Sequence, residues 1–520
     1  YKNKVLFIRH SNPRLALSQF ANKIYNKIPN KITAVTGTNG KSSVADFYYQ
    51  IHALNRLNCA IIGTLGIKSK NFKKKTYNTS LDILSLYETL ENLKRKNVNN
   101  CILEASSHGL NQHRLTGVKI NSAIFTNISR DHYDYHKNYK NYLKSKLTLF
   151  NKILTNKGSA IFNENFKEAG KLNSICKKRN IKIINVGKNS IINLIKINCI
   201  KDFQKVIFTF KNKKYIFKTN LIGEVQIKNL ILAIAAASQF IPISKIVKIL
   251  PLIKPINGRL QKIGTLKNQA KVILDYAHTP DALETCIKSL KKQFRNNKIS
   301  LVFGCGGDRD KNKRGMMGRI ANKYCDKIFL TDDNPRNENP KIIRKQIKNK
   351  IDKIKLREIS SREIAIKEAL LELNSGEILV VAGKGHENYQ QYKKKKFFSD
   401  VLFIKKYIHI KNKSLSNSWK TNIINEQLRE KKIKISTNIE NFSTNSKNIK
   451  TNSCFIGLKG QNFDGNKFAD HAIKNKAKVA IIEKIFKKRD KKKIKVKNTL
   501  KTFSDISKSI REVSNLVAIG

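Results

Sequence analysis

A short loop at residues 36–43 (TGTNGKSS) brings together two glycines, a lysine and several hydroxyl side chains. Glycines let backbone N–H groups surround a phosphate, while Lys41 would reach the β- and γ-phosphates and Ser42 would ligate Mg²⁺. The full phosphate-loop pattern has its first glycine where Val35 stands. An apolar run, Ile32–Val35, precedes the loop, and a helical face follows it at Val44, Phe47, Tyr48 and Ile51. This context predicts a nucleotide site.

Two further polar clusters follow apolar, strand-like runs. Glu104 opens the segment EASSHG, and His132 closes the segment TNISRDH. Because the carboxyl ends of parallel strands meet at one edge of a sheet, both side chains are expected beside the phosphate loop. A carboxylate and an imidazole placed there suit metal ligation. Either one alone is more often a helix cap or a satisfied polar group, but two such clusters beside a phosphate loop favour the metal site.

A third group of motifs carries charges of both signs. It consists of DYAHTPD (275–281), GCGGDRD (304–310), DNPR (333–336) and GKGHE (383–387). Arg309 and Arg336 offer planar forks for a carboxylate, while Asp333 and Glu387 can hold an amine. Such a site fits an amino-acid substrate. Surface turns would explain any one motif, but they explain four motifs at strand ends poorly.

The elements that must position these residues alternate between strands and helices from Lys31 to about Ala382, which predicts an α/β fold. The expected buried strands are Ile32–Val35, Cys101–Leu103, Ala123–Phe125, Val272–Leu274, Leu301–Phe303, Ile328–Leu330 and Ile378–Val381. A Pro/Gly-bearing stretch at Pro251–Gly258 predicts a domain boundary. A second break is expected near Lys411–Ser418, followed by short strands and turns over Ile433–Glu483.

The chain of 520 residues has room for about three to five domains. Its 40% hydrophobic content allows ordinary cores, and no run of about 18 apolar residues predicts a membrane helix. The start, YKNK, has neither an initiator Met nor an apolar signal region, so we expect a fragment. Eight cysteines without CxxC or zinc spacing predict reduced thiols in a cytosolic protein. A collagen, a mucin, a membrane channel and a disulfide scaffold are excluded.

The charge balance is strongly basic, with 104 Lys and Arg against 37 Asp and Glu, a net charge of +67. Clustered cations would indicate a nucleic-acid or anionic-surface binder. The basic residues are instead spread along the whole chain, with abundant Asn and Ile, as an AT-rich genome would produce. We therefore favour compositional drift over a specific nucleic-acid partner.

With these residues in hand, the chain resembles the Mur ligase family of peptidoglycan synthesis, and residues 1–411 are similar to its diaminopimelate-adding branch. The resemblance rests on seven motifs in the family's order: TGTNGKSS, EASSHGLNQHR, FTNISRDHYDYH, LDYAHTPDAL, FGCGGDRDKNKR, DNPR and AGKGHE. It implies that ATP drives amide bond formation between UDP-MurNAc-L-Ala-D-Glu and meso-diaminopimelate through an acyl phosphate. In that family DNPR marks the diaminopimelate adders, because lysine adders lack the Arg.

The resemblance also implies the site residues. For ATP they are Gly37, Thr38, Asn39, Gly40, Lys41, Ser42, Ser43, Asn229, Asp275 and His278. Catalysis would fall to Lys41, Glu104, His132 and Lys146, with no clear general base. Mg²⁺ would be held by Ser42, Glu104, His132 and Lys146 as its carbamate, N6-carboxylysine. The nucleotide-peptide would contact Asn78, Thr79, Ser80, Ser106, Gln112 and Arg114. Diaminopimelate would contact Arg309, Asp333, Asn334, Pro335, Arg336, Gly383 and Glu387.

The same resemblance implies a domain plan. Residues 1–30 would be the tail of a missing uridine-binding domain, 31–255 the P-loop ATPase domain and 256–411 a Rossmann-like ligase domain. After a linker at 412–420, residues 421–500 resemble the small α/β N-terminal domain of the D-alanyl-D-alanine-adding branch, on Ser446-Lys447 and the segment 455–465. Residues 501–520, ending at Val517–Gly520, would lead into a truncated second ATPase domain. We expect a cytoplasmic fragment of a fused two-ligase polypeptide, with no membrane insertion.

Three alternatives stay open at this point. One is a related amide ligase, either lysine-adding or of the folylpolyglutamate synthetase type, against which Arg336 argues. Another is an inactive truncated ligase. The last, from a different class, is a basic nucleic-acid-binding protein, which the net charge alone supports.

Overall fold

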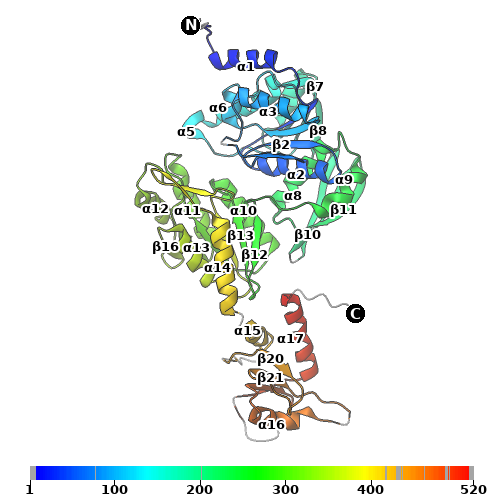
Figure 1. Cartoon of the computed structure of the whole chain (residues 1–520), viewed down its shortest axis with the longest axis vertical. Helices are drawn as coiled ribbons and strands as arrows, with labels where there is room; N and C mark the ends of the chain where they lie inside the picture. Colours follow the sequence, from blue (N-terminus) through cyan, green and yellow to red (C-terminus); the bar gives the residue numbers. More distant parts are fainter. Residues whose placement is uncertain are drawn as a thin grey trace. The chain divides into compact units, whose positions relative to one another are not determined.

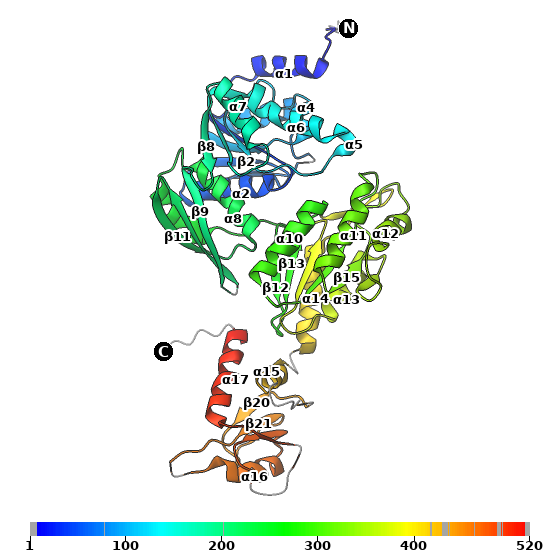
Figure 2. The ribbon, with the colours of Figure 1, turned by 180° about the vertical axis from the view of Figure 1, so that it is seen from behind.

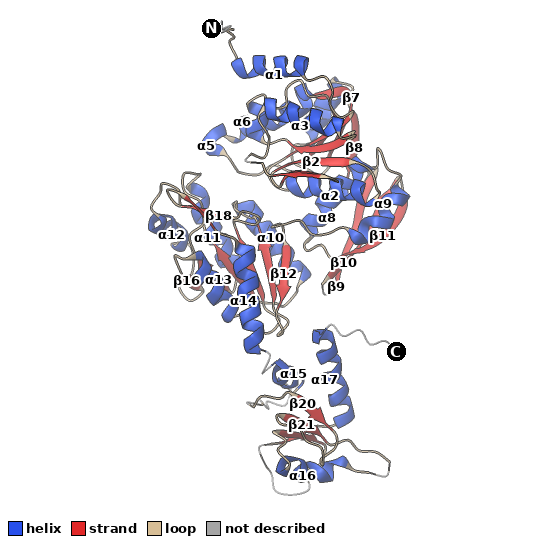
Figure 3. Cartoon of the chain, in the orientation of Figure 1, coloured by secondary structure: helices blue, strands red, loops and turns tan. Residues whose placement is uncertain are grey.

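The structure is a computed structural model that describes residues 8–76, 78–200, 202–415, 419–428, 435, 437–461, 463–485, 490 and 492–514 (Figure 1). The chain forms two compact units. The first comprises residues 1–262, 273–365 and 380–400, and the second comprises residues 263–272, 366–379 and 401–520. Helices and strands alternate along the chain (Figure 3), which confirms the expected α/β class.

The larger sheet of the described residues has eleven strands. In spatial order they are β11 (Lys213–Thr219), β10 (Phe203–Phe210), β9 (Ile192–Ile200), β8 (Lys182–Val186), β7 (Leu154–Asn163), β6 (Ile120–Phe125), β1 (Lys31–Thr36), β5 (Asn100–Glu104), β2 (Cys59–Gly63), β3 (Gly66–Ser69) and β4 (Phe72–Lys74). The seven strands from β9 to β2 pair in parallel. Antiparallel strands extend the sheet at both edges.

The central strands are apolar at almost every position because both faces of the sheet are covered. Ala34 of β1 packs into one core and its neighbour Val35 into the other. Leu103 and Ile102 of β5 divide in the same way, since successive side chains of a strand point to opposite faces. Parallel sheets are buried on both sides for this reason, and their strands form continuous apolar runs.

Helices from different parts of the sequence cover the two faces (Figure 2). One face carries α3 (Ile83–Arg95), α6 (Tyr139–Thr148) and α7 (Ala169–Lys178). The other carries α2 (Lys41–Leu54), α8 (Glu224–Ala237) and α9 (Ile243–Ile249). The shorter elements of this region are α1 (Pro13–Ile24), α4 (Ser107–Asn111), α5 (Tyr133–His136), η1 (Leu149–Ile153) and η2 (Leu250–Leu252). The four apolar residues expected on one face of α2 are all buried.

A second sheet has six strands among the described residues. Their order is β12 (Gln261–Thr265), β13 (Lys271–Asp275), β17 (Ile378–Ala382), β14 (Ile299–Phe303), β15 (Lys327–Leu330) and β16 (Leu356–Glu358). Its helices are α10 (Pro280–Gln293), α11 (Asn312–Tyr324), α12 (Pro340–Lys348), α13 (Arg362–Leu371) and α14 (Asp400–Leu415). A hairpin of β18 (Tyr389–Gln391) and β19 (Lys395–Phe397) follows β17. The four strands expected here from the sequence lie within β13, β14, β15 and β17.

The break expected near Lys411–Ser418 begins later than the sequence indicated. Helix α14 continues to Leu415, and residues 416–418 lie outside the described part of the chain. The helix persists because Ile404, Tyr407 and Leu415 are buried at helical spacing, while Lys405 and Lys406 are exposed.

The last part of the chain forms a small α/β layer. Its strands β20 (Asn441–Ser443), β21 (Ser453–Ile456), β22 (Val479–Ile482) and β23 (Lys493–Lys495) are all parallel. Helices α15 (Trp419–Gln427) and α17 (Thr499–Ser514) pack on one face, and α16 (Ala469–Lys474) packs on the other, after the turn η4 (Gly465–Phe468). The expected chain end at Val517–Gly520 lies outside the described residues. None of the helices described is both long enough and apolar enough to cross a lipid bilayer.

A buried ion pair ties α13 to the start of α14. Arg362 and Asp400 are both fully buried, and Nε and Nη2 of Arg362 each donate to a different Asp400 oxygen at 2.8 Å. Nη2 of Arg362 also donates to the carbonyl of Ala382 at 2.8 Å. Removing one partner leaves the other charge buried and unpaired.

We expect Arg362→Ala to lower the free energy of unfolding by about 3–5 kcal/mol, measured by urea denaturation. Arg95→Ala is the matched control, because Arg95 is 68% exposed and its ion pair with Glu91 lies at the surface. That variant should change stability by less than about 1 kcal/mol. Equal effects of the two substitutions would contradict the role given to burial.

Candidate active site

The phosphate loop joins β1 to α2 and depends on a glycine at the helix start. Gly40 has a φ of 87°, in the left-handed region that side chains disfavour. A Cβ at Gly40 would also lie 2.6 Å from Oδ1 of Asn229 on α8. The glycine therefore permits both the turn into α2 and the close approach of Asn229, a residue predicted for the ATP site.

Two lysines converge on one carbonyl of this loop. The ammonium of Lys41 donates to the carbonyls of Gly37 and Thr38, at 2.9 and 2.8 Å. Lys146, which α6 supplies, donates to the same Gly37 carbonyl at 2.7 Å. Burial lowers the pKa of Lys41, and burial together with the charge of Lys41 lowers the pKa of Lys146 well below its ordinary value. The fold thus brings two buried amino groups to the loop, although composition alone gave no reason to choose Lys146.

Glu104 ends β5 and is directly bonded to the phosphate loop. Its Oε2 accepts from the Ser42 hydroxyl at 3.0 Å and from the Thr64 hydroxyl at 3.1 Å, and its Oε1 accepts from the Thr64 N–H at 2.8 Å. The carboxylate is 2% exposed. A buried carboxylate in contact with a hydroxyl of the loop is the oxygen set that Mg²⁺ prefers.

This donor set fits a particular kind of metal site. Within the described ranges, no group of three or more His, Cys, Asp or Glu side chains is arranged to hold a metal ion. Mg²⁺ at nucleotide sites is commonly bound by one or two carboxylates together with substrate phosphates. Ser42 and Glu104 match that mode, with His132 in the same pocket.

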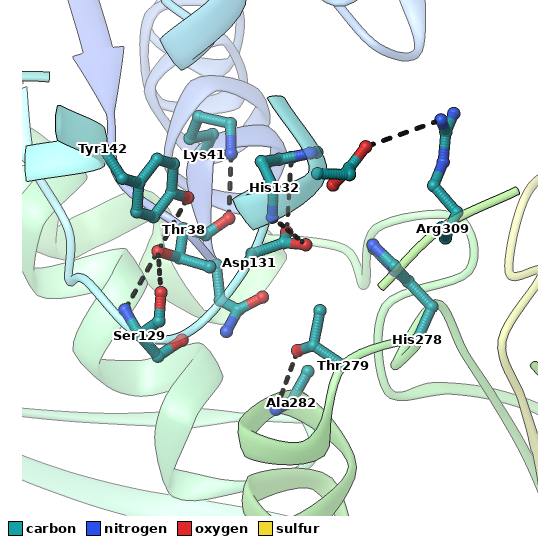
Figure 4. A network of polar contacts seen from close by, with 12 residues as sticks. Thr38, Lys41, Ser129, Asp131, His132, Tyr142, His278, Thr279, Ala282 and Arg309 are labelled. Carbon is teal, nitrogen blue, oxygen red and sulfur yellow. Dashed lines mark hydrogen bonds and ion pairs between the residues drawn. The ribbon is translucent and has the colours of Figure 1, made fainter. Parts of the chain in front are cut away.

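Asp131 and His132 lie in the loop after β6, close to Lys41 (Figure 4). Nε2 of His132 is 3.3 Å from Oδ2 of Asp131, and His132 has a left-handed φ of 54°. Burial lowers the pKa of His132 to about 3, so its imidazole is neutral near pH 7. Neutral imidazole is the form that ligates metals.

A separate hydrogen bond joins the phosphate loop to α6. It links the hydroxyls of Thr38 and Tyr142, which lie 3.0 Å apart.

The residues expected to contact the nucleotide-peptide form a connected polar wall. The hydroxyls of Thr79 and Thr64 are hydrogen-bonded at 3.0 Å, and so are the hydroxyls of Ser80 and Ser106, also at 3.0 Å. Arg114 donates to the Ser80 carbonyl at 2.8 Å and to Oε1 of Gln112 at 2.7 Å. Together with Asn78 they line one pocket with Lys41.

The residues expected to bind the amino acid are also brought together. Asn334 donates to Oε2 of Glu387 at 3.1 Å, and Arg336 donates to the Gly307 carbonyl at 2.6 Å. Oδ1 of Asp333 is buried and accepts no hydrogen bond from the described residues, although the ammonium of Lys384 lies 3.6 Å away. Arg309 lies near the edge, with Nη1 3.9 Å from Oδ2 of Asp134.

These walls enclose a pocket of about 550 Å³. The predicted residues that line it are Lys41, Asn78, Thr79, Ser80, Ser106, Gln112, Arg114, His132, Lys146, His278, Arg309, Asp333, Asn334, Arg336, Gly383 and Glu387. The predicted residues that line a pocket of about 250 Å³ are Thr38, Asn39, Gly40, Lys41, Ser42, Ser43, Thr79, Glu104, His132, Asn229, Asp275 and His278. Of these, Lys41, Thr79, His132 and His278 belong to both pockets. Gly37 and Pro335 line neither pocket, and Gly37 contributes its carbonyl instead.

Asp275 orders a loop as well as lining the smaller pocket. Its Oδ2 accepts from the Leu260 N–H at 2.6 Å and its Oδ1 from the Ala277 N–H at 2.8 Å, and burial raises its pKa. Nδ1 of His278 donates to the Tyr276 carbonyl at 2.8 Å. The protein backbone thus already engages both carboxylate oxygens of Asp275 and one nitrogen of His278.

Several residues of the site were missed from the sequence, among them Arg259, Tyr276 and Lys384. Nη2 of Arg259 lies 3.4 Å from the Ser42 hydroxyl, and Tyr276 and Lys384 both contact Glu387. Tyr276 and Lys384 stand inside motifs that the sequence had already singled out, so their positions were a usable signal. Arg259 follows Gly258 at the predicted domain boundary, where nothing in the sequence marks it as a phosphate-side residue.

Comparisons with known proteins agree with this geometry. Residues 35–237 match the Mur ligase middle domain, and residues 258–385 match the Mur ligase glutamate ligase domain. The UDP-N-acetylmuramoyl-L-alanyl-D-glutamate–2,6-diaminopimelate ligase of Rickettsia montanensis is 40% identical over 415 residues, which span 78% of this chain and 85% of the relative.

Solved structures show the same fold. A 2,6-diaminopimelate ligase structure is 31% identical, with a TM-score of 0.56, over 78% of this chain and 84% of its own. A bifunctional folylpolyglutamate synthase/dihydrofolate synthase from Yersinia pestis, complexed with AMPPNP and a Mn ion, is 16% identical, with a TM-score of 0.57, over 74% of this chain and 92% of its own. At that identity the likeness concerns the fold alone. From the two domain matches and the 40% identity, this chain belongs to the Mur ligase family, whose members are ATP-dependent amide ligases.

Proposed function

We propose that this protein joins meso-diaminopimelate to UDP-MurNAc-L-Ala-D-Glu, with ATP as co-substrate, in the cytoplasm. One observation carries the proposal: a single pocket holds the phosphate-loop lysine, Lys41, together with Arg336 and Glu387, which suit the two ends of an amino acid. Relatives that are about 40% identical are named as ligases of this kind.

The reaction has two steps. The D-glutamate carboxylate takes the γ-phosphoryl group of ATP, which gives an acyl phosphate and ADP. The amine of diaminopimelate then attacks the acyl carbon, so that a C–N bond forms and the C–O bond to phosphate breaks. The amine loses its proton as the amide forms, and inorganic phosphate leaves. Because phosphoryl transfer needs chiefly positioning and neutralisation of charge, buried cations are the protein's main contribution.

The phosphate end of the pocket supplies those cations. Lys41 would contact the transferring phosphoryl group, and Arg259 would lie beside it through its contact with Ser42. Ser42, Glu104, His132 and carbamylated Lys146 would hold Mg²⁺, which supplies further charge neutralisation. Gly37–Ser43, with Asn229, Asp275 and His278, would bind ATP, which agrees with their place around the smaller pocket or in the loop itself.

The other two substrates would divide the larger pocket. Asn78, Thr79, Ser80, Ser106, Gln112 and Arg114 would hold the nucleotide-peptide. Arg309 and Arg336 would bind carboxylates of diaminopimelate, and Asp333 and Glu387 an ammonium group, with Asn334, Pro335 and Gly383 shaping the wall. The buried Oδ1 of Asp333 lies 3.6 Å from the Lys384 ammonium but accepts no hydrogen bond from the residues described, and an ammonium ligand would supply one.

Residues 421–500 would be the substrate-binding domain of a second ligase, of the D-alanyl-D-alanine-adding kind, joined by the segment 412–420. The parallel sheet β20–β23 supports this proposal, because Ser446-Lys447 and the Gly457–Gly465 loop follow the carboxyl ends of two adjacent strands. Ligands of open α/β sheets bind at such ends.

The first test is phosphate release by the chain with ATP, Mg²⁺ and UDP-MurNAc-L-Ala-D-Glu. We expect meso-diaminopimelate to stimulate release, and L-lysine and L-glutamate to leave it at background. Lys41→Ala should lower the stimulated rate by on the order of 10²–10³-fold, because it removes a preorganised cation from the transition state. Lys144→Ala, at an exposed position of α6, is the control. Stimulation by L-glutamate alone would favour a folylpolyglutamate-type ligase, and by L-lysine alone a lysine-adding enzyme.

A second prediction concerns selection of the amino acid. Arg336→Ala should raise KM for meso-diaminopimelate about 10- to 100-fold, since a hydrogen bond to a charged group contributes about 1.5–3 kcal/mol. KM for ATP should stay within about twofold, because Arg336 does not line the smaller pocket. Steady-state phosphate release measures both constants. An unchanged KM for diaminopimelate would remove Arg336 from the substrate site.

A third prediction concerns Lys146. Its lowered pKa enlarges the fraction of neutral amine, which is the form that adds carbon dioxide to give a carbamate. Chelation of Mg²⁺ should abolish phosphate release, because Lys146 is assigned to the Mg²⁺ site. In ¹³C-bicarbonate we expect a protein-bound carbamate signal by ¹³C NMR that is absent from Lys146→Ala and present in Lys144→Ala. A signal that persists in Lys146→Ala would place the carbamate elsewhere.

A further inference from the structure

Tyr276 directly follows β13 and lines both pockets of the site. Its hydroxyl donates to Oε1 of Glu387 at 3.2 Å. Its ring lies beneath the guanidinium of Arg259, with 4.2 Å between the guanidinium carbon and the ring centroid. One side chain therefore contacts a residue at the amino-acid end and a residue at the phosphate end.

Glu387 is held through both of its oxygens. Its Oε2 accepts from Asn334 at 3.1 Å and from the buried ammonium of Lys384 at 3.2 Å. Its Oε1 accepts from Tyr276. The Lys384 and Asn334 bonds fix one oxygen, but a carboxylate can still rotate about that point. The bond to Tyr276 fixes the second oxygen, and with it the direction in which Glu387 presents its remaining lone pairs.

At the phosphate end of the site, Arg259 contacts both Tyr276 and the phosphate loop. Arg259 lies over the ring of Tyr276, and its Nη2 is 3.4 Å from the Ser42 hydroxyl of the phosphate loop. A guanidinium over an aromatic face is attracted by the ring electrons. The ring of Tyr276 therefore has a neighbour over one face, in addition to the hydrogen bond that its hydroxyl makes.

The backbone around Tyr276 leaves little freedom for the ring to move. Gly258 and Gly385 both have left-handed φ angles, 69° and 53°, and their loops touch. A Cβ at Gly258 would lie 2.4 Å from the backbone nitrogen of His386, and a Cβ at Gly385 would lie 2.8 Å from the Cβ of Tyr276. The loop that carries Glu387 thus packs directly on Tyr276 and on the loop that carries Arg259.

We propose that Tyr276 is a positioning residue that orients Glu387 to receive the ammonium group of the incoming amino acid. This inference rests on the proposed function, since it assigns Glu387 to that ligand. Burial and the neighbouring Glu387 carboxylate raise the pKa of the Tyr276 hydroxyl, so the group stays a proton donor throughout the neutral range. The fixed orientation lowers the entropy lost when the amine binds.

The substitution Tyr276→Phe isolates the hydroxyl, because it keeps the ring under Arg259 and against Gly385. We expect KM for meso-diaminopimelate to rise about 10-fold or more, while kcat changes by less than about threefold and KM for ATP by less than about twofold. Tyr392→Phe is the matched control. Its hydroxyl also donates to a carboxylate, Oδ2 of Asp332 at 3.0 Å, but Tyr392 does not line the pocket.

A double-mutant cycle separates positioning from general support of the fold. If Tyr276 acts through Glu387, then adding Tyr276→Phe to Glu387→Gln should raise KM by less than about twofold further. Fully additive effects would overturn the proposal. So would an unchanged KM in Tyr276→Phe, a fall in kcat at constant KM, or an equal rise in KM in Tyr392→Phe.

The outcomes also separate this inference from the proposed function. If the unsubstituted chain uses diaminopimelate but Tyr276→Phe behaves like it, the positioning role alone fails. If another amino acid stimulates phosphate release, the proposed substrate fails, and the same KM comparison with that amino acid decides the role of Tyr276. If no amino acid stimulates the unsubstituted chain, both proposals are wrong.

Discussion

The carbonyl of Gly37 accepts hydrogen bonds from two buried amino groups, those of Lys41 and Lys146, and the rest of the site is arranged around this pair of lysines. Two adjacent buried cations are costly unless anions offset them. Glu104 and Asp131 supply negative charge nearby, and a polyphosphate would supply more. The parallel sheet makes the arrangement possible, because strands β1, β5 and β6 deliver the loop, Glu104 and the Asp131-His132 segment to the same edge.

The amino-acid end follows a different rule, in which opposite charges are closely paired inside the protein. Lys384 is fully buried beside Asp333 and Glu387, so the two carboxylates can lie close together without an uncompensated negative charge. Arg309 and Arg336 remain at the wall of the pocket. A substrate that carries both an ammonium and carboxylates matches this division, whereas a polyanion such as nucleic acid would meet Asp333 and Glu387 in the same space.

Much of the fold was predictable because its signals are local. Apolar runs such as Ile32–Val35 and Ile378–Val381 became buried strands, since a parallel strand covered on both faces is apolar throughout. The end of α14 was not predictable from the polar composition of residues 411–418, because the burial of Leu415 is decided by the tertiary fold. Within the site, the motif residues around Lys41, Glu104 and Glu387 were found for the same reason that the strands were: each follows an apolar run.

The sequence by itself determined which segments carry chemistry, and its seven ordered motifs determined the family. It did not determine which side chains meet. Lys146 is one of many lysines by composition, and Arg259 stands in an unremarkable boundary segment, yet α6 places Lys146 on the Gly37 carbonyl and Tyr276 holds Arg259 near Ser42. Contacts of this kind join residues far apart in the chain, and their strength depends on burial and distance. Only the tertiary structure sets those two quantities.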